Sequence, residues 1–264
     1  MTKLASLWIG PELGNLEQLC ARSFIDTGNE LTIYCYDDLK DVPDGVKVAD
    51  ARSILDTKRI LRHGGDGSPA IHADIFRYAM LQATGNIWVD LDVFSLREFF
   101  FDTEYVFGFE MGTQVNNAVL GLPKTSAALQ GLCSMNVDTF GFPKAGNIKR
   151  RLEWLWSMRF RPTSIEYWPW GCTGPRAATY YFRKTGEVKH ARPIEAFYPV
   201  GFQDLDQLVI PGALTVDEFS DATYGIHLWA AGLKRHVNGQ LGGKVHPNSL
   251  LGELMSKYGL PLTV

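Results

Sequence analysis

Residues 86–94 read NIWVDLDVF, a short apolar run interrupted by Asp90 and Asp92. If this run is a strand, alternation puts both carboxylates on one face, with their backbone positions about 6–7 Å apart. Two carboxylates this close repel each other unless a cation lies between them. A hard divalent metal ion is the natural partner, and diphosphate oxygens would complete its coordination shell. The run therefore predicts a divalent metal site beside a buried strand.

Strand and helix patterns alternate on both sides of this run. That alternation is typical of an α/β fold with a mostly parallel central sheet and helices on both faces, in which ligands bind at the carboxyl ends of the strands. The second half is less regular and partly helical, and no linker or repeat divides the chain, so we expect a single domain over residues 1–264. The expected strands are 4–9, 31–36, 86–94, 105–110, 117–122 and 222–226, and the expected helices are 13–24, 49–62, 69–84 and 125–135.

Composition excludes several classes of protein. The chain has 264 residues, of which 45% are hydrophobic and 21% charged, so it is not a disordered chain. Its net charge of −3 argues against a nucleic-acid binder. Four scattered cysteines without a Cys-x-x-Cys pair argue against a disulfide scaffold and a zinc ribbon. No apolar run is long enough to span a bilayer and no signal peptide is visible, so we expect a cytoplasmic protein.

Asp74, Arg77 and Tyr78 lie on one face of the helix expected at 69–84 because they are spaced i, i+3 and i+4. A carboxylate and a guanidinium placed together can hydrogen-bond sugar hydroxyls and hold phosphate oxygens. The alternative is an ion pair within the helix with Tyr78 packed beneath it. The residues alone leave both interpretations open.

Four further positions are candidates for ligand contacts. Trp8 ends the first expected strand, where an indole could stack on a base. Asn116 and Asn117 follow the run that ends at Glu110 and offer amide groups to hydroxyls. His227 follows a strand-like segment and could bind a transition metal such as Mn²⁺, although a lone histidine is more often structural.

Residues 140–170 carry a net charge of +4 and four of the seven tryptophans. Basic residues between tryptophans suit an anionic, lipid-like surface, which predicts peripheral contact with the inner face of a membrane. The alternative, which we favour, is a helix whose tryptophans pack inward while its basic face is solvated.

Together these motifs resemble the GT-A glycosyltransferases with a DXD sugar-binding signature, in particular glycosyltransferase family 32 and the glucosylating clostridial toxin domains. The resemblance is most specific between Asp74 and Asp92 and extends from Trp8 to Trp229. The motifs that carry it are Trp8–Gly10, Ala73–Tyr78, Gly85–Asp92, Asn116-Asn117, Thr173-Gly174-Pro175 and His227-Leu228-Trp229.

The resemblance implies a Rossmann-like GT-A fold and a site built around Mn²⁺ or Mg²⁺. Asp92 and His227 would bind the metal directly, and Asp90 would reach it through water while contacting ribose or sugar. Trp229 would reach the diphosphate or the glycosidic oxygen, and Arg77 would stabilise the same charge. The implied catalytic residues are Asp90, Asp92, Arg77 and Trp229.

The resemblance also assigns residues 1–122 to the nucleotide sugar and residues 123–264 to the acceptor. Thr173, Gly174 and Pro175 would lie on the acceptor side, with Gly174-Pro175 opening a helix. The implied donor-binding residues are Trp8, Asp74, Arg77, Tyr78, Trp88, Asp90, Asn116, Asn117 and Trp229.

The function implied is transfer of a sugar from a nucleoside-diphosphate sugar to a saccharide or lipid-linked saccharide, as in polysaccharide biosynthesis. Retention of anomeric configuration and a uridine donor are the expected forms. One alternative is a non-catalytic sugar-nucleotide or glycan-binding protein of the same fold. Another is a phosphohydrolase of the haloacid-dehalogenase type, but Phe94 stands where that family usually has Thr or Val.

Overall fold

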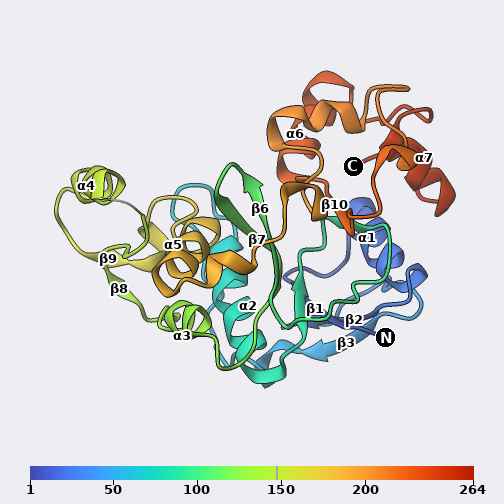
Figure 1. The fold of residues 1–264 in the computed structure, drawn as a ribbon. Coiled ribbons are helices and arrows are strands. Elements are labelled where there is room, and N and C mark those ends of the chain that lie inside the picture. The colour runs from blue at the N-terminus through green and yellow to red at the C-terminus, as the bar shows by residue number, and fades with distance from the viewer. Residues whose placement is uncertain (147) are drawn as a thin grey trace. The chain divides into compact units, whose positions relative to one another are not determined.

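The computed structural model describes residues 1–146 and 148–264; residue 147, part of the basic stretch 140–170, lies outside the described residues. The fold is mixed α/β with a mostly parallel central sheet, as the sequence predicts (Figure 1). The strands are β1 (Lys3–Trp8), β2 (Glu30–Cys35), β3 (Lys47–Asp50), β4 (Ile87–Val89), β5 (Val93–Ser95), β6 (Val106–Met111), β7 (Gln114–Gly121), β8 (Phe140–Gly141), β9 (Thr163–Ser164) and β10 (Gly225–His227). The six-stranded sheet has the order β3-β2-β1-β4-β7-β6, and β10-β5 and β8-β9 form separate pairs.

Helices fall between most of these strands. The α-helices are α1 (Asn15–Asp26), α2 (Ala70–Thr84), α3 (Ala127–Cys133), α4 (Ile148–Ser157), α5 (Pro175–Thr185), α6 (Ala230–Gln240) and α7 (Leu250–Lys257). Short 3-10 helices are η1 (Ala51–Ser53), η2 (Ile165–Tyr167), η3 (Glu187–His190), η4 (Ile194–Ala196), η5 (Phe202–Leu208) and η6 (Val216–Glu218).

The described chain forms two compact units, each built from separate stretches. Unit 1 comprises Met1–Ala49, Val89–Asp102 and Pro193–Val264, and unit 2 comprises Asp50–Trp88 and Thr103–Arg192. The assignment of residues 1–122 to the donor and 123–264 to the acceptor concerns binding and stays a prediction.

Unit 1 is organised around a parallel strand pair and a helical core. β1 and β2 pair in parallel with Leu4 opposite Leu31, both fully buried. α1 connects them and packs against β5, and Gly28, at φ +83°, supplies the left-handed turn expected after that helix. A continuous apolar cluster joins α1 and β5 to α6 and α7, through residues such as Leu19, Phe94 and Leu233. This core includes Phe94 and Ile226, which anchor the short β5–β10 pair within it.

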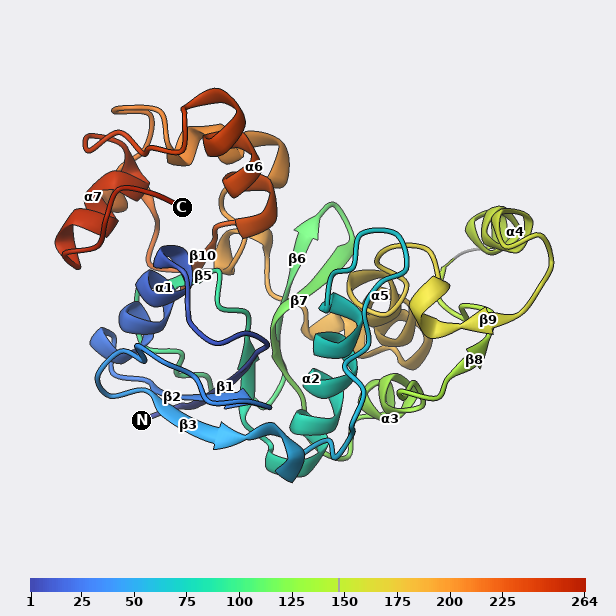
Figure 2. The same cartoon turned by 180° about the vertical axis from the view of Figure 1, so that it is seen from behind.

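Unit 2 is built on the antiparallel hairpin β6–β7, which α5 covers (Figure 2). Phe107 of β6 stacks on Phe182 of α5 with ring centroids 4.2 Å apart. α3 packs on α5 so closely that a Cβ at Gly131 would lie 2.3 Å from the Tyr181 ring, so glycine is required there. The result is a dense core beneath α5 that holds the residues preceding this helix in place.

Two local predictions are wrong. In place of the helix expected at 49–62, the structure has the end of strand β3, the short 3-10 helix η1 and then loop residues up to 62. The Asp50 side chain caps the start of η1 by accepting from the Arg52 N–H at 2.8 Å, a local contact that competes with a longer helix. The single strand expected at 86–94 is two strands, β4 and β5, separated by a turn. Within the described residues, no helix is long and apolar enough to cross a membrane.

His72 in α2 makes the stability of the fold pH-dependent. Its ring is fully buried, its Nδ1 accepts from the Leu61 N–H at 3.3 Å, and burial lowers its pKa from 6.5 to about 4. Because the folded pKa lies below the unfolded one, the unfolded chain takes up the proton first as pH falls from 6.5 toward 4. We expect about 3 kcal/mol of the free energy of unfolding to be lost over that window.

Urea unfolding of the wild type and of His72→Gln at several pH values between 4 and 7 measures this loss. The variant should show a shallower pH dependence in that window, since it removes the buried ionisable ring. Equal slopes for the two proteins would show that His72 does not carry the effect.

Candidate functional site

Asp90 and Asp92 lie in the turn between β4 and β5, not along one strand as the sequence suggests. The Val93 N–H donates to the Asp90 carbonyl at 3.1 Å and closes the turn. The two carboxylates converge nonetheless. Ligand atoms of Asp90, Asp92 and His227 lie within 4.8 Å of one another, and all three residues belong to unit 1.

The pairing of β5 with β10 brings His227 to this turn. The strands are antiparallel with Val93 opposite His227, and the Leu228 N–H donates to the Asp92 carbonyl at 2.7 Å. The ring Nε2 of His227 consequently lies 3.2 Å from Asp92 Oδ1. Backbone pairing thus brings together two residues that are 135 positions apart in the sequence, and their side chains then meet.

Asp92 is held ionised although it is largely buried. Burial raises the pKa of its carboxyl, but the charge and hydrogen bond of His227 and the Ala230 N–H outweigh it and hold the pKa below its ordinary value. The Ala230 N–H, which opens α6, donates to Asp92 Oδ2 at 2.9 Å, so the carboxylate also lies at the positive end of a helix. An ionised carboxylate is the form that a metal ligand requires.

Trp229 closes one side of this group. It adopts left-handed backbone angles (φ 54°, ψ 51°), which are uncommon for a bulky residue and mark a local conformation that surrounding contacts impose. Its ring centroid lies 4.0 Å from that of His227, and its indole N–H donates to the Val200 carbonyl at 2.9 Å. Tyr198 packs edge-on against His227 from another side.

The three residues fit a divalent cation. Two carboxylates and one imidazole are an oxygen-rich donor set with one nitrogen, which suits Mn²⁺ and, through the carboxylates, Mg²⁺. Each carboxylate oxygen has two lone pairs, so the hydrogen bond that each oxygen of Asp92 accepts leaves capacity for an ion.

A second group of predicted site residues lies in unit 2 and forms a buried polar network. Asp74 Oδ1 accepts from Arg77 at 3.0 Å and from the Asn117 amide at 2.9 Å, and Oδ2 accepts from the Thr173 hydroxyl at 2.7 Å. The Tyr78 hydroxyl donates to the Thr173 carbonyl at 2.7 Å. The ion pair within the helix, which was one of the two interpretations of the sequence, is therefore present. Asn117 of β7 and Thr173, which precedes α5, add further hydrogen bonds to it.

Burial dominates the electrostatics of this network. It raises the pKa of the Asp74 carboxyl, and the Arg77 charge and the Thr173 and Asn117 hydrogen bonds offset only part of that rise. The Arg77 guanidinium also lies 4.6 Å from the centroid of the Trp88 ring. A Cβ at Gly174 would lie 3.0 Å from Asp74 Oδ2, so a larger residue there would have to displace the buried carboxylate slightly.

The remaining predicted residues are placed as follows. Pro175 opens α5 at its first turn, as expected. Asn116 has partners other than Asp74: its amide donates to Glu110 at 3.2 Å and its side-chain carbonyl accepts from the Ala118 N–H at 2.8 Å. Trp8 ends β1 and donates its indole N–H to the Glu12 carbonyl at 2.8 Å. Ligand roles for these residues stay predictions.

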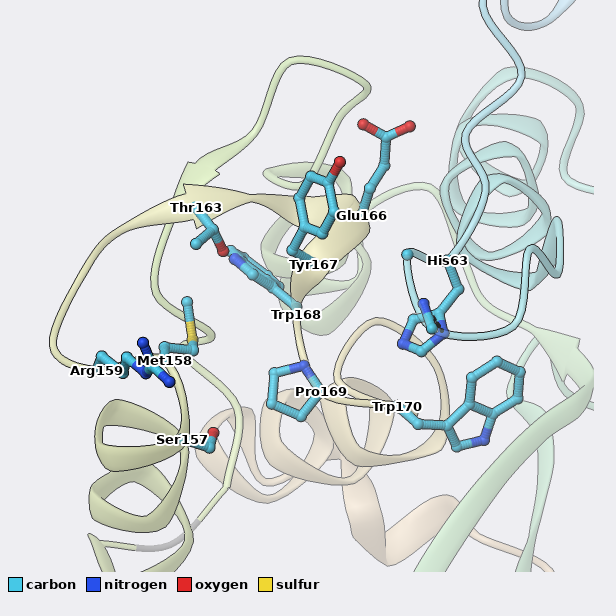
Figure 3. Close-up of a pocket in the computed structure, with 12 residues that line it drawn as sticks. His63, Ser157, Met158, Arg159, Thr163, Glu166, Tyr167, Trp168, Pro169 and Trp170 are labelled. Atoms are coloured by element: carbon cyan, nitrogen blue, oxygen red, sulfur yellow. Dashed lines mark hydrogen bonds between the residues drawn. The ribbon is translucent and has the colours of Figure 1, made fainter.

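Unit 2 also contains a hollow of about 510 Å³ that sequence patterns did not reveal (Figure 3). His63 and Trp170 meet edge to face on one side of it, with ring centroids 5.2 Å apart. Tyr167 and Glu166 line a second side of the hollow, and Arg159 lies across it from His63 and Trp170. Tyr167 is 66% exposed and Trp170 is 53% exposed, and two exposed aromatic rings lining one hollow form an apolar patch of the kind found in ligand-binding grooves.

Comparisons with known proteins give a distant structural likeness and no match of sequence. No protein-family model and no curated protein sequence matches the chain. Among solved structures it is similar to one described as PaToxG Glycosyltransferase, at 13% sequence identity and a TM-score of 0.45, over 72% of each chain. The likeness is too distant to carry an argument about activity, which therefore rests on the residues described above.

Because the Asp74–Arg77 pair is buried, we expect a large loss of stability when the negative charge of Asp74 is removed. Asp74→Asn removes the negative charge that lies 3.0 Å from the buried Arg77 guanidinium, and we expect the free energy of unfolding to fall by about 3–5 kcal/mol. Glu153→Gln breaks the exposed Arg150–Glu153 pair and should cost about 1 kcal/mol or less. Urea unfolding of both variants makes the comparison; similar losses would mean that the buried charge is not required.

Proposed function

We propose that the protein is a metal-dependent glycosyltransferase of the GT-A type that uses a nucleoside-diphosphate sugar, with UDP-sugars favoured. The observation that carries the proposal is the convergence of Asp90, Asp92 and His227 on one point of unit 1. The DXD resemblance of the sequence assigned Asp92 and His227 to a metal directly and Asp90 to the same metal through water.

The barrier in such a transfer is departure of the nucleoside diphosphate from the anomeric carbon. A bound Mn²⁺ or Mg²⁺ supplies Lewis-acid neutralisation of the charge that develops on the leaving diphosphate. Asp92 and His227 would hold that ion, with His227 Nε2 losing the proton it shares with Asp92 Oδ1 so that its lone pair faces the ion instead. The indole N–H of Trp229 donates to the Val200 carbonyl in this structure. In the proposed complex it would donate to a diphosphate oxygen instead.

The donor-side residues of unit 2 act through their buried network in this proposal. Asp74 and Asn117 orient each other, and the Asn117 amide nitrogen also donates to the Tyr78 hydroxyl at 3.2 Å, so the pair offers sugar hydroxyls its remaining oxygen lone pairs. Arg77, paired with Asp74, is the cation that the resemblance assigns to the phosphate side of the donor. Retention of configuration follows from the family resemblance, as same-face attack assisted by the leaving diphosphate.

We assign the acceptor to the aromatic hollow of unit 2. Exposed rings of Tyr167 and Trp170 offer the flat apolar faces on which sugar rings stack, and the Glu166 carboxylate can accept from hydroxyls. Thr173, Gly174 and Pro175 follow this aromatic segment directly in the chain. The acceptor class that this chemistry fits is a saccharide, free or lipid-linked.

Calorimetric titration with UDP and with GDP, each with Mn²⁺ and with a chelator, tests the donor and metal site. We expect UDP to bind in the presence of Mn²⁺ and Asp92→Asn to weaken that binding at least tenfold, since a direct metal ligand is lost. Asp221→Asn, at a fully exposed carboxylate of unit 1, is the matched control and should bind as the wild type.

The other outcomes distinguish the alternative functions. If UDP binds but the protein hydrolyses no UDP-sugar in a separate assay, the non-catalytic binding protein is favoured. Failure of both nucleotides to bind would contradict the transferase, and phosphate release from a model phosphoester would then identify a phosphohydrolase.

A glycan array tests the hollow separately from the donor site. Trp170→Ala should lower binding of the glycans that the wild type retains by about tenfold, because a stacking ring is lost. Phe100→Ala removes an exposed ring of unit 1 and should change nothing. The assignment fails if the wild type retains no glycan or if Trp170→Ala binds the same glycans equally well.

A further inference from the structure

Helix α4 presents an apolar face to solvent. Ile148, Leu152 and Trp156 are spaced four residues apart and therefore lie on one side of the helix. Their exposed fractions are 79%, 58% and 75%. An apolar side of a helix normally faces a core, so an exposed one implies a partner surface that the chain alone does not supply.

The way that α4 is attached explains this orientation. Trp154 is its buried residue, 4% exposed, and the guanidinium of Arg176 lies 6.0 Å from the Trp154 ring centroid. At 100° per residue, Trp154 points away from the side that carries Leu152 and Trp156. The helix is thus fixed to unit 2 through one side while the opposite, apolar side is left outward, and both views place α4 at the edge of that unit (Figures 1 and 2).

Phe160 extends the apolar face beyond the end of the helix. Arg159 and Phe160 both adopt left-handed backbone angles (φ 51° and 54°), and the Phe160 N–H donates to the Leu155 carbonyl at 2.8 Å. This turn brings the Phe160 ring to 5.9 Å from the Trp156 ring, edge to face, and leaves it 61% exposed. We call Ile148, Leu152, Trp156 and Phe160 the apolar stripe.

Positive charge surrounds the apolar stripe. Residues 144–161 have a net charge of +5, and their single acidic residue, Glu153, pairs with Arg150 at 3.2 Å. Helical spacing places Lys149 and Arg151 on the two flanks of the stripe. The remaining basic residues of this set are Lys144, Arg159 and Arg161.

We propose that α4 and the turn at Arg159–Arg161 form a docking surface for an anionic lipid membrane. Long apolar side chains with a tryptophan on one face and basic residues on both flanks match a helix lying in the headgroup region of a bilayer. Lys and Arg on the flanks are attracted to anionic lipid, which supplies the complementary charge. The structure thus combines the two interpretations of residues 140–170, since Trp154 packs inward and Trp156 faces outward. The proposal is independent of the glycosyltransferase assignment.

Flotation with vesicles of phosphatidylcholine alone, or with 30% phosphatidylglycerol, tests the proposal. The wild type should float with the anionic vesicles at low salt, much less at high salt, and not with phosphatidylcholine alone. Trp156→Glu should lower the partition coefficient at least tenfold, and Lys149→Gln and Arg151→Gln about fivefold each. Phe100→Glu, which places the same charge at an exposed aromatic site of unit 1, should float as the wild type.

Two controls keep the outcomes distinct. Because Trp156 is exposed, its variant should retain the wild-type urea unfolding curve, and nucleotide titration of the same variant should be unchanged. The proposal is overturned if the wild type does not float with anionic vesicles, or if Trp156→Glu floats with them as well as the wild type does. A dimer seen by light scattering that Trp156→Glu dissociates, without vesicle binding, would show instead that a second copy covers the stripe.

Discussion

The Asp92 carboxylate is the interaction on which unit 1's candidate site depends. One carboxylate oxygen accepts from His227 and the other accepts from the first N–H of α6, while the backbone carbonyl of Asp92 accepts from the Leu228 N–H. These bonds tie the turn after β4 to β10 and to the start of α6. Trp229 is held in its left-handed conformation within this loop of contacts. A single side chain thereby serves as ion-pair partner, helix cap and candidate metal ligand, and a change at Asp92 acts on all three.

Buried carboxylates play opposite electrostatic parts in the two units. In unit 1, His227 and a helix N-terminus lower the pKa of Asp92, which keeps the group charged and suited to a cation. In unit 2, burial raises the pKa of Asp74 against the pull of Arg77, and both of its oxygens accept protein hydrogen bonds. This contrast favours Asp92 as the direct ligand and gives Asp74 a mainly positioning part, with charge balance supplied by Arg77.

Sequence patterns predicted the parts of the molecule that local periodicity controls. The helix at 69–84, the first two strands and the mixed α/β class follow from apolar spacing, and the DXD resemblance brought His227 together with Asp90 and Asp92. The turn at 90–92 was missed because a tight turn between two short apolar strands has the same composition as one strand. The hollow lined by His63 and Trp170 joins residues about a hundred positions apart, which no periodic pattern records. Trp154 is buried and Trp156 is exposed because the orientation of their helix depends on tertiary packing, which local sequence does not specify.

Anomalous diffraction from crystals soaked in Mn²⁺ and UDP tests the central claim most directly. The account predicts one Mn²⁺ peak bounded by Asp92 and His227, with Asp90 close to it and the diphosphate oxygens on its open side. Manganese bound elsewhere, or UDP bound while these three residues keep their present contacts and hold no ion, would contradict it.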